Sequence, residues 1–379
     1  MTEPPKQIPA ADLKAQYISL KADIDAAIQK VLQHGQFILG PEVKALESEI
    51  ANFCGTKFAI GVASGTDALR LALLACGVGQ GDEVITTPFT FVATAETIVQ
   101  CGAVPVFADI DPHSFNIDPD KISKKITSKT KVILPVHLYG QSADMDSIME
   151  LARCHNLKVI EDAAQALAGE YKGKKVGSIG DAGCLSFFPS KSLGAYGDGG
   201  MVVTNDAKVA DACDLLRKHG AMVSYYYDLI GFNSRLDTIQ AAVLSVKLKH
   251  LSAWTETRRK LAAQYNNLLS NVDGIQPHLI ESFANPSFNY YTIRVIDPRL
   301  SRDKLREFLT SHGVQSMVYY PLSLHLQSAY KYLGCKLGDF PESEKAQKEV
   351  LSLPMYPELS MTQVGQIVEA IKEFVKLQK

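Results

Sequence analysis

The chain has 379 residues, of which 46% are apolar and 21% are charged, and its formal net charge is -2. This length predicts two domains, or one large and one small, rather than a single simple core. The near-balanced charge gives no electrostatic basis for nucleic-acid binding, and no stretch approaches the roughly 20 apolar residues of a membrane span.

The first residues, Met1 to Lys6, lack a basic region followed by an apolar one, so no secretory signal is expected. The seven cysteines form no Cys-x-x-Cys pair and lie mostly in apolar runs. This usage indicates reduced thiols in a cytoplasmic protein. The nine histidines are scattered without ligand spacing, so no metal site is expected.

Short apolar runs alternate with helical patterns as far as residue 204. The helical candidates include Asp67–Cys76 and Asp144–His155. Strands that alternate with helices favour an α/β fold with a mostly parallel sheet, in which ligands bind at the carboxyl ends of strands. The strand-like runs are Phe58–Val62, Glu83–Thr86, Val104–Phe107, Val132–Val136, Lys158–Ile160, Cys184–Phe188 and Gly200–Thr204.

From Ser234 onward, apolar residues recur every three or four positions and predict a long helix, which Arg258–Leu269 continues as a second segment. Beyond residue 251 the pattern is that of a smaller α+β unit. We therefore expect a large domain over residues 1–250 and a small one over 251–379. The elements expected in the small unit are a strand at Tyr290–Val295, a helix at Arg302–Ser311 and a strand at Val314–Tyr320.

Lys191 and Asp162 are the most informative pair of residues. Asp162 ends an apolar strand, and Lys191 lies between a strand and a glycine cluster that begins at Gly194. Pyridoxal phosphate needs an amine that condenses with its aldehyde and a carboxylate that keeps its pyridine nitrogen protonated. Lys191 could then act as the general base. The alternatives are a lysine on a polar turn and an aspartate that merely caps a helix.

The turn around Gly65 and Thr66 follows a strand and opens a helix, with Thr66 as a candidate cap. Free amides at a helix start suit a phosphate, although a plain strand-to-helix turn is the alternative. Ser186, five residues before Lys191, could donate to the same phosphate.

Three further residues could contact the cofactor ring. Phe91 offers a ring that could stack on the pyridine face, and Phe89 is its rival. Gln165, three residues after Asp162, could hydrogen-bond the ring hydroxyl.

Together these motifs resemble the DegT/StrS group of pyridoxal phosphate-dependent nucleotide-sugar aminotransferases. The resemblance runs from about Ile8 to Leu359. Its motifs are Gly35–Glu42, Ser64–Leu69, Gly81–Pro88, Pro135–Gly140, Glu161–Gln165, Ser186–Lys191, Gly231–Asp237 and Ser352–Met355.

The resemblance implies an aspartate aminotransferase-like fold (fold type I) and a homodimer with shared active sites. It makes Lys191 the Schiff-base lysine and Asp162 the partner of the pyridinium. Asn233 would reach the phosphate from the neighbouring subunit, and Arg235 would approach the substrate from there. The remaining implied contacts are Gly65, Thr66 and Ser186 to the phosphate, Gln165 to the ring hydroxyl, Phe91 to the ring face, and His325 in a substrate-binding segment.

The implied reaction moves an amino group from glutamate to a keto group of a nucleotide-linked sugar. Gln165 and the segment Asn233–Asp237 are more similar to enzymes that act on carbon 3 than on carbon 4. A 4-keto aminotransferase and a related sugar dehydratase are the alternatives, and Lys191 argues against the dehydratases, which carry histidine there. The sequence does not distinguish UDP-linked from dTDP-linked sugars.

Two other functions are disfavoured by the sequence. A cofactor-binding sensor without turnover would show a fused DNA-binding segment or lack Lys191, and the sequence shows neither. A nicotinamide dehydrogenase would carry Gly-x-Gly-x-x-Gly after its first strand, which this chain lacks.

Overall fold

A seven-stranded sheet forms the centre of the structure, a computed structural model that describes residues 7–223 and 225–378. Only β9 is antiparallel to its neighbours, so the expectation of a mostly parallel mixed sheet is confirmed. From one edge to the other the strands are β1 (Phe58–Val62), β9 (Gly200–Thr204), β8 (Ala182–Ser186), β5 (Lys158–Asp162), β4 (Thr130–Ile133), β2 (Glu83–Thr86) and β3 (Val104–Phe107).

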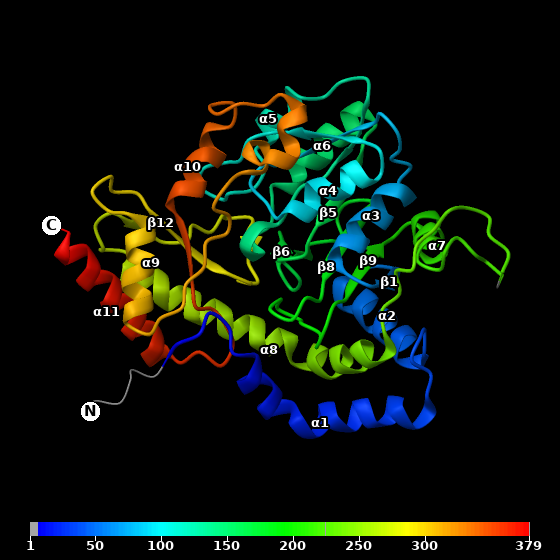
Figure 1. Ribbon diagram of the computed structural model, residues 1–379, viewed down its shortest axis with the longest axis horizontal. Helices are drawn as coiled ribbons and strands as arrows, with labels where there is room; N and C mark the ends of the chain where they lie inside the picture. Colours follow the sequence, from blue (N-terminus) through cyan, green and yellow to red (C-terminus); the bar gives the residue numbers. More distant parts are fainter. Residues whose placement is uncertain (1–6, 224, 379) are drawn as a thin grey trace.

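Helices cover both faces of this sheet because successive side chains of each strand point to opposite sides. In β5, Val159 belongs to the apolar cluster on one face and Ile160 to the cluster on the other. The first face packs against α2 (Pro41–Cys54) and α6 (Met145–His155). The second packs against α3 (Gly65–Ala75), α4 (Val92–Gln100) and α7 (Ala207–Leu216) (Figure 1).

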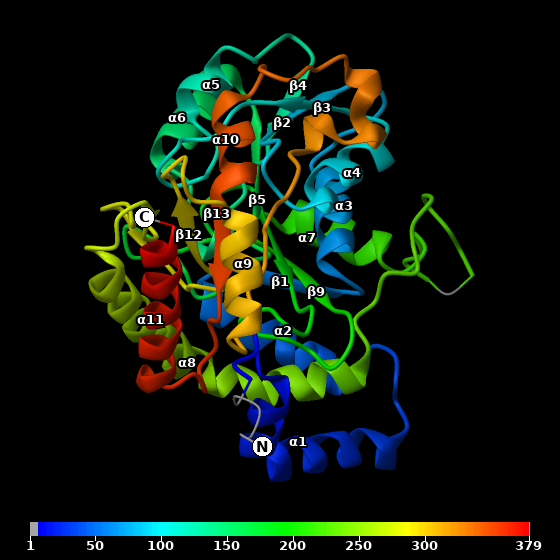
Figure 2. The same ribbon diagram turned by 60° about the vertical axis from the view of Figure 1, so that its left-hand side comes forward.

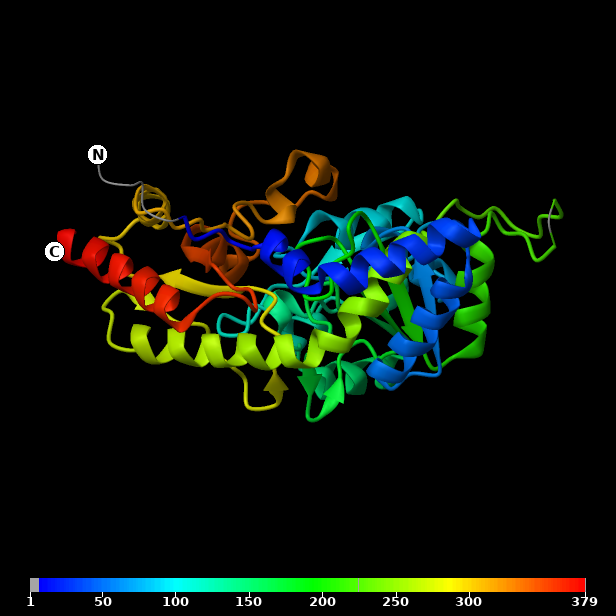
Figure 3. The same cartoon turned by 90° about the horizontal axis from the view of Figure 1, so that it is seen from below.

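One long helix, α8 (Thr238–Leu269), runs along the sheet and on into the C-terminal part of the chain, with α1 (Leu13–His34) beside its first half (Figure 3). Leu251 of α8 packs in the core of the sheet, whereas Tyr265 packs in a separate C-terminal core. The helix therefore crosses residue 250 without a break, and the division of the chain there stays a prediction. Among the described residues, no helix has the length and apolar character needed to cross a membrane.

The C-terminal part is a small antiparallel sheet covered by helices. Figure 2 shows α9 (Arg302–Ser311) and α11 (Met361–Leu377) side by side next to this sheet. Its strands are β10 (Ile275–Gln276), β12 (Tyr291–Val295) and β13 (Val350–Leu353), and α10 (Pro341–Glu349) precedes β13. The other short elements are α5 (Pro119–Ser123), β6 (Glu170–Tyr171), β7 (Lys174–Lys175), β11 (Ala284–Asn285) and the 3-10 turns η1 (Leu138–Gly140), η2 (Leu324–Leu326) and η3 (Ser328–Leu333).

Two elements of the C-terminal part differ from those expected from the sequence. Val314–Tyr320 forms no regular strand: Val314 makes a bridge to Ile8 and Met317 a bridge to Ser352. The two ends of the segment thus pair with different parts of the chain. Pro321 follows the segment and has no N–H to donate, so the pairing cannot continue beyond it. The second helical segment expected at Arg258–Leu269 is instead the end of α8, which holds no glycine or proline that would interrupt it.

A buried carboxylate fixes the end of β5. Glu161 points to the face opposite Asp162, as the alternation along a strand requires. Its Oε2 accepts hydrogen bonds from His137 Nε2 at 2.8 Å and Gly177 N at 2.7 Å, and its Oε1 accepts from Ile179 N and Gly180 N. Burial alone would raise the pKa of Glu161, but His137 and these amides outweigh it, and the pKa lies below its ordinary value.

The Glu161→Gln substitution is expected to lower the free energy of unfolding by about 3 kcal/mol near neutral pH, since charge-assisted bonds to buried amides are lost. Because folding lowers the pKa, the contribution of Glu161 is complete above its unfolded-state pKa and is lost as the pH falls through the folded-state value. Urea unfolding of the apoprotein at several pH values measures both effects. Exposed Glu150→Gln on α6 is the control, and equal losses in the two variants would contradict this role.

Candidate active site

A cavity of about 540 Å³ lies at the carboxyl ends of β2, β5 and β8. Its walls come from the start of α3, the loop before α4, the end of β5, the loop after β8 and three tyrosines of the C-terminal part. This is the edge at which ligands bind in sheets of this class. The residues expected from the sequence that line it are Gly65, Thr66, Phe91, Asp162, Gln165, Ser186 and Lys191.

Lys191 presents its amine to this cavity from the loop that follows β8. Its Nζ lies 5.6 Å from the ring centroid of Tyr290, over the ring face. Burial lowers the pKa of Lys191 to about 8, and the attraction of Asp162 opposes that shift. Near neutral pH, a much larger share of this amine than of a solvated lysine is therefore unprotonated and nucleophilic.

Asp162 is the last residue of β5 and is buried beside the cavity. Its Oδ2 accepts a hydrogen bond from the Thr94 hydroxyl at 2.8 Å, and its Oδ1 accepts one from Ala164 N at 3.2 Å. Burial raises the pKa of Asp162, although these two donors and Lys191 pull it downward. A cation placed in the cavity would therefore restore the charged form that burial disfavours.

The first turn of α3 forms another part of the cavity wall. Ser64, not Thr66 as expected, is the N-cap, and its hydroxyl accepts from Asp67 N at 3.0 Å. The amides of Gly65 and Thr66 lie in this first turn, where an α-helix supplies no acceptor. A Cβ on Gly65 would lie 2.7 Å from the Cβ of Ser186, so only glycine allows these segments to meet. The arrangement suits a phosphate.

The structure separates the two candidate stacking rings. Phe91 lines the cavity and is 54% exposed, whereas Phe89 is fully buried behind it. The Tyr320 ring neighbours both, with its centroid 6.3 Å from that of Phe91 and 6.2 Å from that of Phe89. Phe91 is therefore the ring available to a ligand.

The side-chain amide of Gln165 already makes two hydrogen bonds within the protein. Its Oε1 accepts from Tyr139 N at 2.9 Å, and its Nε2 donates to the Tyr320 hydroxyl at 2.9 Å. One hydrogen of the amide nitrogen is left for a ligand.

Asn233 and Arg235 lie beside the cavity rather than within it. They line a neighbouring, more polar hollow that shares Ser64 and Asp198 with the main cavity. Arg235 Nη2 donates to Asn233 Oδ1 at 2.7 Å. The pair thus lies next to the start of α3. That these two residues reach the phosphate and the substrate of a neighbouring subunit stays a prediction.

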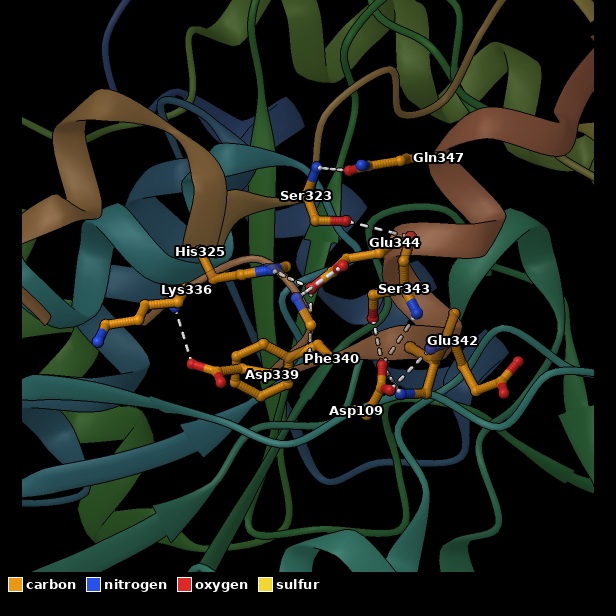
Figure 4. Close-up of polar contacts among 12 residues, drawn as sticks. Asp109, Ser323, His325, Lys336, Asp339, Phe340, Glu342, Ser343, Glu344 and Gln347 are labelled. Atoms are coloured by element: carbon orange, nitrogen blue, oxygen red, sulfur yellow. Dashed lines mark hydrogen bonds and ion pairs between the residues drawn. The ribbon is translucent and has the colours of Figure 1, made fainter. Parts of the chain in front are cut away.

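The structure does not bring His325 to the cavity. Its imidazole is buried, with Nε2 3.1 Å from Glu344 Oε1 and the ring edge-on to Phe340 (Figure 4). Ser323 N donates to Gln347 Oε1 at 2.6 Å in the same network. His325 therefore fastens the segment after Tyr320 to α10, and a direct contact with substrate stays a prediction.

Sequence reasoning missed four residues of the site. Thr94 holds Asp162, and Tyr290, Tyr319 and Tyr320 close the cavity from the C-terminal part. They come from segments that no local spacing connects to Lys191. The one available signal was the Tyr-Tyr-Pro run before the expected substrate-binding segment.

These residues fit pyridoxal phosphate. The cavity holds a nucleophilic amine, a buried carboxylate that interacts with that amine, and a helix start approached by a serine hydroxyl. An amine, a carboxylate and a phosphate-binding turn are the groups that the aldehyde, the ring nitrogen and the phosphate of this cofactor require.

Comparisons with known proteins agree with this geometry. Residues 19–372 match the model of the DegT/DnrJ/EryC1/StrS aminotransferase family. The chain is 52% identical over 372 residues to a pleiotropic regulatory protein of Geobacillus stearothermophilus, covering 97% of this chain and 99% of that protein. It is 45% identical over 360 residues to the UDP-2-acetamido-2-deoxy-3-oxo-D-glucuronate aminotransferase of Pseudomonas aeruginosa, covering 95% and 98%.

Among solved structures, the crystal structure of DesV of Streptomyces venezuelae superposes with a TM-score of 0.95 at 40% identity, covering 98% of this chain and 99% of that one. The fold is therefore that of an aminotransferase of fold type I, as the resemblance implied.

The low pKa of Lys191 predicts how its amine reacts in the apoprotein. Trace acetylation should rise with pH and pass through its midpoint at about pH 8, whereas a solvated lysine titrates near 10.4. Peptide mass spectrometry of Lys191 across a pH series measures this, and exposed Lys14 is the reference in the same sample. Because Asp162 raises the pKa of the amine, Asp162→Asn should move the midpoint to lower pH. A midpoint near 10.4 would refute the burial argument.

Proposed function

Because the chain belongs to the DegT/DnrJ/EryC1/StrS aminotransferase family, we propose that it transfers the amino group of glutamate to the carbon-3 keto group of a UDP-linked sugar. The observation that carries this proposal is the meeting of Lys191 and Asp162 in one cavity with the start of α3. The relative from Pseudomonas aeruginosa supports a UDP-linked 3-oxo sugar as substrate. Gln165 and the segment Asn233–Asp237 support the same carbon.

Each residue then has a defined task. Pyridoxal phosphate, the cofactor of this family, supplies an electron sink for the bonds of the substrate carbon that carries nitrogen. Asp162 keeps the proton on the ring nitrogen, and Thr94 holds the carboxylate in place. Lys191 moves the proton at the reacting carbon. The first turn of α3 and Ser186 hold the phosphate.

Arg235 gives a reason to consider a uronate. Its planar guanidinium matches a carboxylate bidentately, and its Nε is buried without an acceptor among the described residues. A carboxylate on the sugar would supply that acceptor.

A regulatory role without turnover is the second candidate, because a relative of 52% identity is named a regulatory protein. The presence of Lys191 and Asp162 in one cavity favours catalysis over mere binding, because the amine can serve as both nucleophile and base.

The protein is further proposed to work as a cytoplasmic homodimer. All seven cysteines are free, which suits a reducing compartment. The described residues of the segment after α7 extend away from the sheet in Figure 1, and they expose apolar side chains that a second copy would cover. The exposed side chains are Met222, Val223, Tyr225, Tyr226, Tyr227 and Ile230.

Product analysis tests the reaction. With a UDP-linked 3-amino sugar and 2-oxoglutarate, the protein should form glutamate and the 3-oxo sugar, and NMR of the forward product should place nitrogen on carbon 3. Lys191→Ala should reduce turnover by about 10³-fold or more, because it removes both the nucleophile and the base. Exposed Lys174→Ala is the matched control. Nitrogen on carbon 4, a dehydrated product or full activity of Lys191→Ala would refute the proposal.

Mixed dimers test the shared site. Asn233→Ala should lower activity about 10- to 100-fold, since a hydrogen bond to a charged group contributes about 1.5–3 kcal/mol. If Asn233 serves the neighbouring subunit, dimers of one Lys191→Ala chain and one Asn233→Ala chain carry one intact site and regain activity. If it serves its own chain, every site in the mixture is damaged. Exposed Asn52→Ala should leave activity unchanged.

A further inference from the structure

A second, smaller cavity adjoins the one that holds Lys191. Its volume is about 130 Å³, and Ser190, Tyr290 and Tyr319 line both cavities. Ser190 directly precedes Lys191, and Lys191 Nζ lies 5.6 Å from the centre of the Tyr290 ring. The smaller cavity is therefore separated from the reactive amine by little more than one side chain.

The walls of this cavity combine an apolar surface with one amide donor that lacks a well-formed hydrogen bond. Asn289 is only 4% exposed, and its Oδ1 accepts from the Ser192 hydroxyl at 3.3 Å. Its Nδ2 is buried and makes no well-formed hydrogen bond among the described residues, although it lies close enough to the Tyr290 hydroxyl to oppose the rise in pKa that burial causes there. A buried amide donor without an acceptor costs free energy, which a ligand could recover. The apolar lining residues are Ala10, Ala11, Met317, Leu353 and Met355.

Backbone hydrogen bonds hold these walls in place. Ser352 and Met317 exchange two bonds, at 2.7 and 3.0 Å, between β13 and the segment that leads to Tyr319. Ala10 N donates to Gln315 Oε1 at 3.4 Å, which ties the N-terminal segment to the segment that leads to Tyr319. Because both sides are fixed, the cavity is formed before a ligand arrives.

We propose that this cavity binds the acetamido group on carbon 2 of the sugar substrate. The inference rests on the proposed function, because carbon 2 is bonded to the carbon that exchanges its oxygen for nitrogen. A substituent on carbon 2 must therefore lie close to Lys191, on the side of Ser190 and Tyr290 if it enters the smaller cavity. The acetamido carbonyl accepts from Asn289 Nδ2, and the methyl group packs against the methionines.

Size and charge favour this occupant over its rivals. At roughly 30 Å³ per water molecule, the cavity has room for about four water-sized atoms. An acetamido group has one nitrogen, one oxygen and two carbons, whereas a hydroxyl would leave most of the space and the apolar wall unused. No lysine or arginine is among the described residues that line the cavity, so a carboxylate would lose its hydration without a counter-charge.

Binding of two unreactive nucleotide sugars tests the inference separately from catalysis. UDP-N-acetylglucosamine should bind the cofactor-loaded protein about 10-fold more tightly than UDP-glucose in isothermal titration calorimetry, because only the former fills the cavity. Asn289→Ala should remove most of this preference. Ala11→Leu, at an exposed position on the rim, should do the same by filling the opening without disturbing the core. Lys14→Leu adds the same side chain at an exposed position of α1 outside the cavity and should keep the preference.

The possible outcomes separate the two proposals. Equal affinity for the two sugars in the unmodified protein, or equal losses for both in the two cavity variants, would overturn the inference even if transamination occurs. A clear preference in a protein that forms no glutamate from any UDP-linked 3-amino sugar would support the cavity and refute the proposed function. Far-ultraviolet circular dichroism of each variant shows whether a lost preference reflects unfolding.

Discussion

The chemistry of this protein depends on two ionisable groups that the fold buries in one cavity. Burial makes the ammonium form of Lys191 unfavourable and also disfavours the carboxylate form of Asp162. Each group partly offsets the penalty of the other, since opposite charges attract. A cationic ring nitrogen at Asp162 would relieve the carboxylate and leave Lys191 free to react. The sheet, its loops and the tyrosines hold this pair of groups apart from bulk water.

Hydrogen bonds on both faces of strand β5 hold Asp162 in position. Asp162 faces the cavity, while its neighbour Glu161 is hydrogen-bonded to His137 and to the turn at residues 177–180 on the other face. A shift of β5 by one residue would turn each carboxylate to the opposite face of the sheet, away from the donors that hold it. The many bonds to Glu161 therefore define the register that puts Asp162 in the site.

Much of the large sheet could be predicted from the sequence because each strand is a short apolar run with clear ends. Phe58–Val62 and Gly200–Thr204 have the bounds expected of them. Helix α1 was not predicted because few of its residues form an apolar face. Its buried residues are Gln16, Leu20, Ile24 and Val31. Thr94 and the tyrosines of the site could not be found either, because their meeting with Lys191 depends on how distant segments fold together. The His325 segment was found by resemblance, but only the structure shows that Glu344 holds the imidazole.

The unbroken course of α8 limits how this chain can vary. The helix has 32 residues, with one end in the core of the sheet and the other in the C-terminal core. An α-helix advances about 1.5 Å and turns about 100° with each residue. One inserted or deleted residue in the middle of α8 would therefore rotate the C-terminal part out of phase with the sheet, and with it Tyr290, Tyr319 and Tyr320. Length changes should accordingly accumulate in surface loops, while the span of α8 stays constant.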